Sequence, residues 1–179
     1  MTLGRGVVKR NPCSHGKRKQ SAVGTTEKQQ MGNSYLKINI HLIFHVKSTG
    51  QLMRESDLPR IFQYIEGIIK SSGGIPIQIG GLPDHIHILT TLPKDSTVPD
   101  FVRNIKAESS RWMKTIDSSY RSFSWQEGYG AFSVSASTLS NAIRYIDGQA
   151  EHHSRKSFLD EYKEFLNAYK IEYDERFVI

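Results

Sequence analysis

The sequence predicts an α+β protein built on a ferredoxin-like (RRM-like) antiparallel sheet, with helices on one sheet face and an additional C-terminal helix that bears a tyrosine. Hydrophobic residues make up 37% of the chain and charged residues 23%, which is the balance of a globular domain. From residue 35 onward, strand-like and helix-like periods follow one another as strand-helix-strand-strand-helix-strand. This order is typical of ferredoxin-like folds, in which helices cover one face of the sheet.

The first strand and the first helix follow from hydrophobic periodicity. Between Ile38 and Val46, every second residue is apolar, and this period of two predicts a strand with one buried face. The other positions are Lys37, Asn39, His41, Ile43 and His45. Apolar residues from Leu58 to Ile69 then recur at helical spacing, and the Ser-Gly-Gly sequence at 72–74 predicts the end of that helix.

The remaining elements are shorter or less regular. Residues 75–79 predict a second strand, 80–84 a turn and 85–91 a third strand; 98–113 predict a second helix and 131–134 a fourth strand. Ser137 or Thr138 can cap a further helix that runs to about His153, and a last helix is expected from about Phe158 to Tyr169.

Charge and composition divide the chain at about residue 33. Residues 1–33 hold seven Lys and Arg against one acidic residue, so this segment accounts for the net charge of +6 and residues 34–179 are formally neutral. The segment lacks hydrophobic periodicity, which predicts a disordered, basic N-terminal extension before a domain at 34–179. Cys13 is the single cysteine, which excludes a disulfide framework and a Cys-based zinc site. With no signal peptide and no long apolar run, we expect a cytoplasmic protein without membrane contact.

The first chemical motif is His85-Ile86-His87 in the predicted third strand. Residues two apart in a strand point to the same face, so both imidazoles can bind one divalent ion while Ile86 points into the core. Taken alone, such a pair is more often a packed or a surface pair than a metal site.

The second motif is Tyr145 with Gln149 in the predicted C-terminal helix. Residues four apart lie on one helix face, so a tyrosine hydroxyl and an amide oxygen can reach the same small volume. The alternative is a core tyrosine with a solvated glutamine. Of the eight tyrosines, only Tyr145 has Gln four residues on in a predicted helix.

Together, His85, His87 and Gln149 form an uncharged, three-ligand site with open coordination positions. Mg²⁺ or Mn²⁺ can fill those positions with a phosphate oxygen and neutralise charge on phosphorus. Tyr145 is then placed to attack a DNA phosphodiester, forming a 5′-phosphotyrosine and releasing a 3′-OH. Because the bond energy is retained, attack by another 3′-OH can rejoin strands.

From about Tyr35 to Phe177 the sequence resembles the HUH single-strand transposases with one catalytic tyrosine, the insertion sequence 200/605 type. The resemblance rests on four stretches in the expected order and spacing, at residues 83–89 (PDHIHIL), 125–133 (WQEGYGAFS), 145–153 (YIDGQAEHH) and 172–177 (EYDERF). It implies that His85, His87 and Gln149 hold the metal and that Tyr145 is the nucleophile. It also implies homodimers in which the tyrosine helix often completes the partner's site, and single-stranded DNA hairpins at element ends as substrates.

Further residues are candidates for DNA contact. Arg103, Lys106 and Arg111 lie on the second helix and can face phosphate, or they can be an ordinary solvated face. Trp125 and Tyr129 can stack on unpaired bases or anchor the turn into the fourth strand. His152 and His153 begin a basic cluster after the tyrosine helix.

Three other functions remain as alternatives. A non-catalytic module that binds single-stranded nucleic acid would carry aromatic residues on the open sheet face, where this sequence has Lys37, Asn39, His41 and the two motif histidines. A replication-initiator or relaxase-like nickase is commonly larger and often has two tyrosines and three histidines. A domesticated transposase retained for another role is the third.

Overall fold

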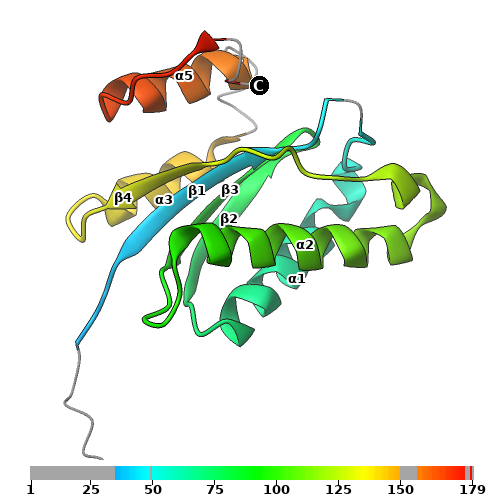
Figure 1. Ribbon diagram of the computed structural model, residues 1–179, viewed down its shortest axis with the longest axis horizontal. Coiled ribbons are helices and arrows are strands. Elements are labelled where there is room, and N and C mark those ends of the chain that lie inside the picture. The colour runs from blue at the N-terminus through cyan, green and yellow to red at the C-terminus, as the bar shows by residue number, and fades with distance from the viewer. Residues whose placement is uncertain (1–34, 49, 150–156, 176–177, 179) are drawn as a thin grey trace, which may run out of the picture. The chain divides into compact units, whose positions relative to one another are not determined.

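The computed structural model describes residues 35–48, 50–149, 157–175 and 178. Its elements follow the predicted order (Figure 1). They are β1 (Asn39–His45), η1 (Glu55–Asp57), α1 (Leu58–Ser71), β2 (Pro76–Leu82), β3 (His85–Thr91), α2 (Val98–Ile116), η2 (Ser118–Ser122), β4 (Gly130–Val134), α3 (Leu139–Asp147) and α5 (Phe158–Ala168). The predicted extension at 1–33 lies outside the described residues. The tyrosine helix, expected to run to about His153, instead ends at Asp147, where Gly148 follows as its C-cap.

The four strands form one antiparallel sheet in the order β2-β3-β1-β4. The long first and third strands therefore occupy the centre, where β1 pairs with β3 so that His45 lies opposite His85 and Ile43 opposite His87. This register brings the histidines of the two central strands onto one face of the sheet. The α+β, ferredoxin-like prediction is confirmed at the level of element order and sheet.

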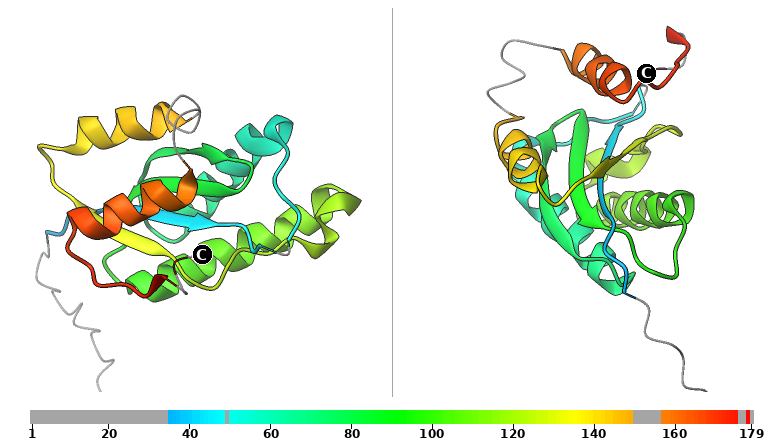
Figure 2. Two further views of the ribbon diagram at one scale, coloured as in Figure 1. Left: turned by 90° about the horizontal axis from the view of Figure 1, so that it is seen from above. Right: turned by 90° about the vertical axis from the view of Figure 1, so that its left-hand side faces the viewer.

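The main hydrophobic core lies between one sheet face and the helices α1 and α2, which run along that face (Figures 1 and 2). The alternate residues Leu42, Phe44, Ile86 and Ile88 supply its sheet side and are at most 1% exposed. Each helix contributes an apolar stripe, because isoleucines recur along α1 at spacings of three and four residues and aromatic and aliphatic residues do so along α2. This burial packs the sheet against its two helices, so the alternate strand residues, which point the other way, lie on the opposite sheet face.

The opposite sheet face is also covered, which corrects the expectation of one buried face in the first strand. Every residue of β1 is buried. The tyrosine helix α3 packs against β2 and β3, and α5 lies over β1 and β4, where Leu166 joins Ile43 and Phe132 in a second, smaller apolar cluster. The alternation in β1 therefore separates two buried environments rather than core from solvent: one is apolar, and the other combines histidines with the smaller apolar cluster.

The second strand is longer than predicted and includes the two glycines expected in the turn. Gly81 has φ +151°, and a Cβ there would lie 2.3 Å from the carbonyl oxygen of His85. A Cβ on Gly80 would lie 2.7 Å from the carbonyl oxygen of Ile146 in α3. The glycines thus let the strand continue to Leu82 while α3 approaches its backbone closely.

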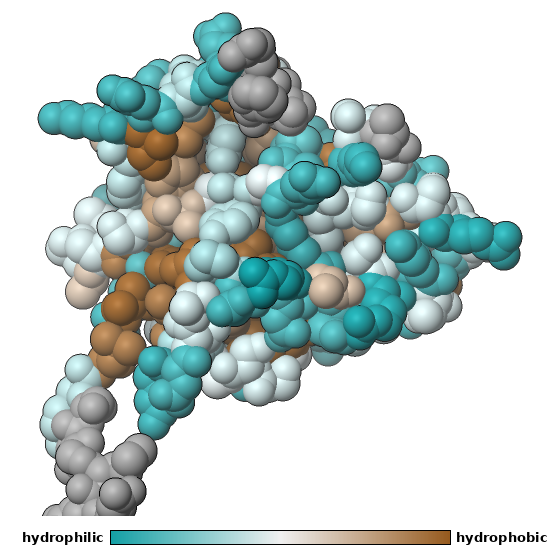
Figure 3. All heavy atoms as spheres, viewed as in Figure 1, coloured by the Kyte–Doolittle hydropathy of each residue, from teal (hydrophilic) through white to brown (hydrophobic). Residues whose placement is uncertain are grey.

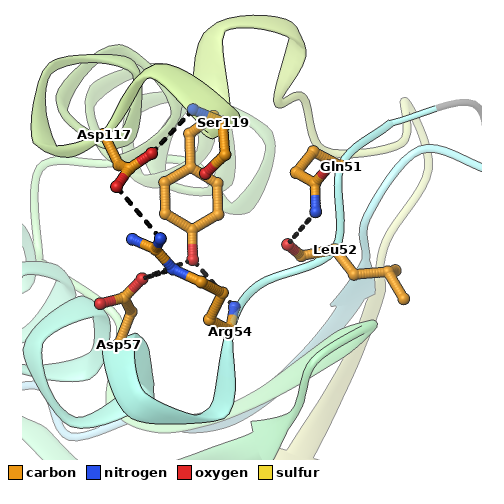
Figure 4. A network of polar contacts seen from close by, with 7 residues as sticks. Gln51, Leu52, Arg54, Asp57, Asp117 and Ser119 are labelled. Carbon is orange, nitrogen blue, oxygen red and sulfur yellow. Dashed lines mark hydrogen bonds and ion pairs between the residues drawn. The ribbon is translucent and has the colours of Figure 1, made fainter.

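A polar network holds the segment before α1 next to the turn that precedes β3 (Figure 4). The Arg54 guanidinium donates to Asp57 at 2.6 Å and to Asp117 at 3.0 Å. The Tyr120 hydroxyl donates to Asp57 at 2.7 Å and accepts from the backbone N–H of Arg54 at 2.8 Å. The neighbouring Met53 N–H donates to the Pro83 carbonyl at 2.8 Å, so the network extends to the turn that carries Asp84.

The surface differs between the two layers. Figure 3 shows a mainly hydrophilic face over α2, with apolar surface gathered near the start of β1. Leu36 and Ile38, just before that strand, are 53% and 39% exposed. No helix in the described ranges combines the length and apolarity that crossing a membrane requires.

Candidate active site

The two motif histidines lie side by side on β3, beneath α3 and α5, and both side chains are fully buried. Nδ1 of His85 is 2.7 Å from Oδ1 of Asp84, and the imidazole stacks on Phe158 of α5 with ring centroids 4.5 Å apart. A carboxylate that accepts from Nδ1–H leaves Nε2 as the lone-pair nitrogen, which is the tautomer a metal ligand needs.

His87 is supported by a third histidine, on the neighbouring strand. Nε2 of His41 and Nδ1 of His87 are hydrogen-bonded at 3.0 Å. Burial lowers the pKa of His41 from 6.5 to about 4, so this imidazole is neutral at neutral pH. When Nδ1–H of His87 donates to His41, Nε2 of His87 carries the lone pair and faces the site. From the sequence, His41 was placed only on the polar face of the first strand.

Tyr145 and Gln149 reach the same place from α3 and the residues just after it. The Tyr145 ring lies 5.8 Å from the His87 ring and 6.2 Å from the His41 ring, centroid to centroid. Oε1 of Gln149, a residue only 2% exposed, is 3.5 Å from Nε2 of His85. The structure therefore brings together all four residues that the two motifs singled out.

Glu161, which was not predicted from the sequence, belongs to the same group. Its Oε1 accepts from Nε2 of Gln149 at 3.0 Å and lies 3.8 Å from Nε2 of His87. Burial raises the pKa of this carboxyl from 4.5 to about 7. A signal was present in the sequence, because Glu161 falls on the apolar stripe of its helix, between Phe158 and Phe165, where a charged residue is unusual.

The donor atoms of this group fit a divalent ion. One nitrogen each from His85 and His87 and one carboxylate oxygen from Glu161 all lie within 4.8 Å of one another. Ligands bound to one ion at about 2.1 Å lie roughly 3.0–3.5 Å apart, so the separations observed need only small side-chain adjustments. Imidazole, amide and carboxylate donors suit Mn²⁺ and, with more water, Mg²⁺.

A groove of about 330 Å³ lies beside the site, lined by the end of β1 and the residues after it, by Asp84 and by the first residues of α5. Phe158, whose ring stacks on His85, is one of its lining residues. Both motif histidines are buried, so a phosphate group can reach them only after side chains that cover them move.

The basic residues predicted to contact DNA from the second helix lie on α2, which covers the sheet face opposite the histidines. Arg103 and Arg111 are exposed and paired with acidic residues of their own helix, Asp100 and Glu108. The Lys106 ammonium donates to the backbone carbonyls of Gln126, Glu127 and Gly128, so it holds the segment before β4 in place. Burial lowers the pKa of this lysine to about 8.

The aromatic residues before β4 have different environments. Trp125 is only 7% exposed, and its Nε1–H donates to Ser109 at 2.9 Å, so in this structure the ring packs in the core and presents no face to a base. Tyr129 is half-buried and, with Arg103 and Lys106, lines a groove of about 450 Å³ between α2 and the 124–129 segment. His152 and His153 lie outside the described residues.

Comparisons with known proteins place the chain in one class of protein, the transposases. The chain belongs to the family of IS200-like transposases, whose sequence model matches residues 34–149. It is 26% identical, over 124 residues, to the ISDra2 transposase TnpA of Deinococcus radiodurans; the match covers 66% of this chain and 89% of that protein.

Two solved structures share the fold. A crystal structure of a transposase candidate from Deinococcus radiodurans R1 superposes with a TM-score of 0.51 at 24% identity, covering 68% of this chain and 97% of the other. A REP-associated tyrosine transposase, solved bound to a REP hairpin, superposes with a TM-score of 0.52 at 15% identity, covering 69% of this chain and 73% of the other. The family assignment confirms the resemblance found in the sequence motifs.

Proposed function

We propose that this transposase cleaves and rejoins single-stranded DNA at the ends of a mobile element through a 5′-phosphotyrosine on Tyr145. One observation supports the proposal above others. The α3 helix carries Tyr145 to within 5.8 Å of the His87 ring, centroid to centroid, and sets Gln149 beside His85. Two motifs about sixty residues apart in sequence thus form one group, in which both histidines and Gln149 are buried and Tyr145 is half-buried.

His85, His87 and Gln149 would hold a divalent ion, Mg²⁺ or Mn²⁺, in this group. When bound, such an ion supplies positive charge that neutralises the phosphate oxygens and orients the phosphodiester. Neighbouring residues fix the tautomer and orientation of the two imidazoles. Asp84 and His41 accept from the outward nitrogens of the two ligands, so that each imidazole points its lone pair inward.

Tyr145 exchanges one phosphoester for another. Its Oη forms a bond to phosphorus, the bond to the 3′ oxygen breaks, the phenol proton is lost and the 3′ oxygen leaves as a hydroxyl. Phe165 packs edge-on against the Tyr145 ring, at 5.4 Å between centroids, and restricts its orientation. The reverse reaction, with a different 3′-OH, joins strands without a nucleotide cofactor.

The proposed substrates are hairpins at element ends, in keeping with the hairpin bound by the REP-associated relative. The groove lined in part by Phe158 is the proposed route for the strand to be cut. The exposed Arg103 and Arg111 of α2, with the groove beside Tyr129, are the proposed contacts for flanking DNA. Replacing either arginine with alanine should weaken binding of all sequences alike and reduce its salt dependence.

The proposed homodimer can be tested together with the origin of its active sites. Tyr145 lies beside His87 of the same chain here. A mixture of Tyr145→Phe and His87→Ala proteins should therefore remain inactive when each site is formed by one chain. Recovery of cleavage on mixing would show instead that the tyrosine helix serves the partner.

The decisive experiment is a cleavage assay on labelled single-stranded hairpins from the flanks of the gene, with Mg²⁺ or Mn²⁺ present and then chelated. The expected result is a covalent protein–DNA adduct that requires the ion and is absent in Tyr145→Phe. Tyr162→Phe, a tyrosine of α5, is the matched control and should retain the adduct. Tight binding of single strands without any adduct would instead support a non-catalytic or domesticated protein.

A further inference from the structure

Glu161 occupies an unusual place for a carboxylate. It is 6% exposed, it lies on the face of α5 that packs on the sheet, and it follows the 34–149 segment that the family model matches. A carboxylate that must give up water at such a position costs free energy unless charge or hydrogen bonds offset the loss. The helix retains it where a leucine or phenylalanine would continue the apolar stripe.

The positive charge of an ion in the proposed metal site would offset the cost of burying this carboxylate. Two neutral imidazoles and one amide would leave both positive charges of a divalent ion uncompensated in a buried site. Oε1 of Glu161 lies 3.8 Å from Nε2 of His87, within the range of two ligands that share an ion after a small side-chain movement.

We propose that Glu161 is a direct, charged ligand of the same ion, so that the metal ties α5 to the central strands. The inference rests on the proposed metal site at His85 and His87. It adds one carboxylate to the two histidines and the Gln149 amide of the proposed site. It also gives α5 a part in holding the ion.

A different role, orienting Gln149, can be separated from this one. The Gln149 amide donates from Nε2 to Glu161 and thereby turns its own oxygen toward His85. A Glu161→Gln variant keeps an oxygen that can accept this hydrogen bond and keeps the side-chain length, but it removes the charge. A ligand is therefore lost or weakened in Glu161→Gln, whereas an orienting partner is retained.

The test measures Mn²⁺ binding without DNA, by the loss of the free-ion electron paramagnetic resonance signal on titration. Glu161→Gln should weaken Mn²⁺ binding by at least about tenfold, since even residues that only support metal ligands are worth about 10–100-fold. Glu164→Gln removes the same charge one turn along on the exposed side of α5 and should change binding less than about threefold, as expected for an exposed charge. Amide exchange in α5 should slow on adding Mn²⁺ in wild type and in Glu164→Gln, but not in Glu161→Gln.

The outcomes separate this inference from the proposed function. If Glu161→Gln binds Mn²⁺ as wild type does while His87→Ala does not, Glu161 is not a ligand and the metal site at the histidines stands. If wild type fails to bind Mn²⁺, or His87→Ala binds it equally well, both the metal site and the role of Glu161 are refuted. Thermal unfolding in chelator confirms that each variant is folded, and we expect Glu161→Gln to be at least as stable as wild type there, because it buries no charge.

Discussion

The pH dependence of stability in the metal-free protein should report directly on the buried His41. In the folded chain burial lowers its pKa to about 4, whereas the unfolded chain has the ordinary value of 6.5. Between these two pH values the unfolded state binds a proton on His41 and the folded state does not. The free energy of unfolding therefore falls as pH decreases from 6.5 towards 4, and no such loss is present well above pH 6.5. With these two pKa values, proton linkage lowers the free energy of unfolding by about 2 kcal/mol between about pH 7 and about pH 5.

Glu161 acts in the same pH range with the opposite sign. Its carboxyl has a pKa raised by burial from 4.5 to about 7, so the folded state binds a proton that the unfolded state does not. Stability from this group therefore grows as pH falls through this window and is lost as pH rises through about 7. The wild-type curve alone can look flat because the two effects oppose each other.

The assay is therefore a comparison of wild type with His41→Gln by urea unfolding, in chelator, at both pH values. The variant retains an amide that can bond to Nδ1 of His87, and its fixed cost of substitution cancels between the two pH values. Wild type should lose about 2 kcal/mol more than the variant on acidification. Equal losses in the two proteins would refute the assignment of His41 as a neutral, desolvated imidazole.

Three further predictions concern the parts that position the site. Gly80→Ala should reduce the cleavage rate by about 100-fold with the fold retained, because the new Cβ pushes α3 away from β2 and misplaces Tyr145. The control is Gly67→Ala on α1, where the new Cβ meets open space, and it should leave the cleavage rate unchanged. Asp84→Ala should weaken Mn²⁺ binding by about 10–100-fold, because Nδ1–H of His85 loses its acceptor; spin-resonance titration measures the affinity, and an unchanged value would contradict that supporting role. Tyr120→Phe should lower the free energy of unfolding by about 1–3 kcal/mol, since a backbone N–H loses its acceptor; a change near zero in urea unfolding would show that water replaces the hydroxyl.

Local sequence pattern was sufficient to predict the type and order of the helices and strands and to find the two chemical motifs. A strand places residues two apart on one face, and a helix places residues four apart on one face, so His85 with His87 and Tyr145 with Gln149 could be paired from spacing alone. Their meeting in space depends on the sheet order and on the close approach of α3 at Gly80, which no local pattern encodes. The resemblance to the family supplied that link.

Residues whose role depends on a distant partner could not be assigned in the same way. The sequence marks Glu161 only as a charged residue on an apolar helix face, and its neighbour His87 becomes known only from the fold. The aromatic Trp125 was open to two interpretations, and the hydrogen bond from its indole to Ser109 in α2 decides for packing. The basic residues of α2 stay predictions, because exposure and local ion pairs are compatible with either a solvated face or a DNA contact.

The alternation of apolar and polar residues in β1 could not reveal that both faces of this strand are buried. A period of two ordinarily separates core from water, and that reading assigned His41 and His45 to an open face. Both are buried instead, because α5 brings aromatic rings to them, Phe165 at 5.2 Å from His41 and Phe158 at 5.4 Å from His45, centroid to centroid. Histidine suits this position because a neutral imidazole can be buried with one hydrogen bond and still offer a nitrogen to an ion or a neighbour. The same sheet therefore carries an apolar core on one side and a buried group of histidines on the other, and both arise from one alternating strand pattern.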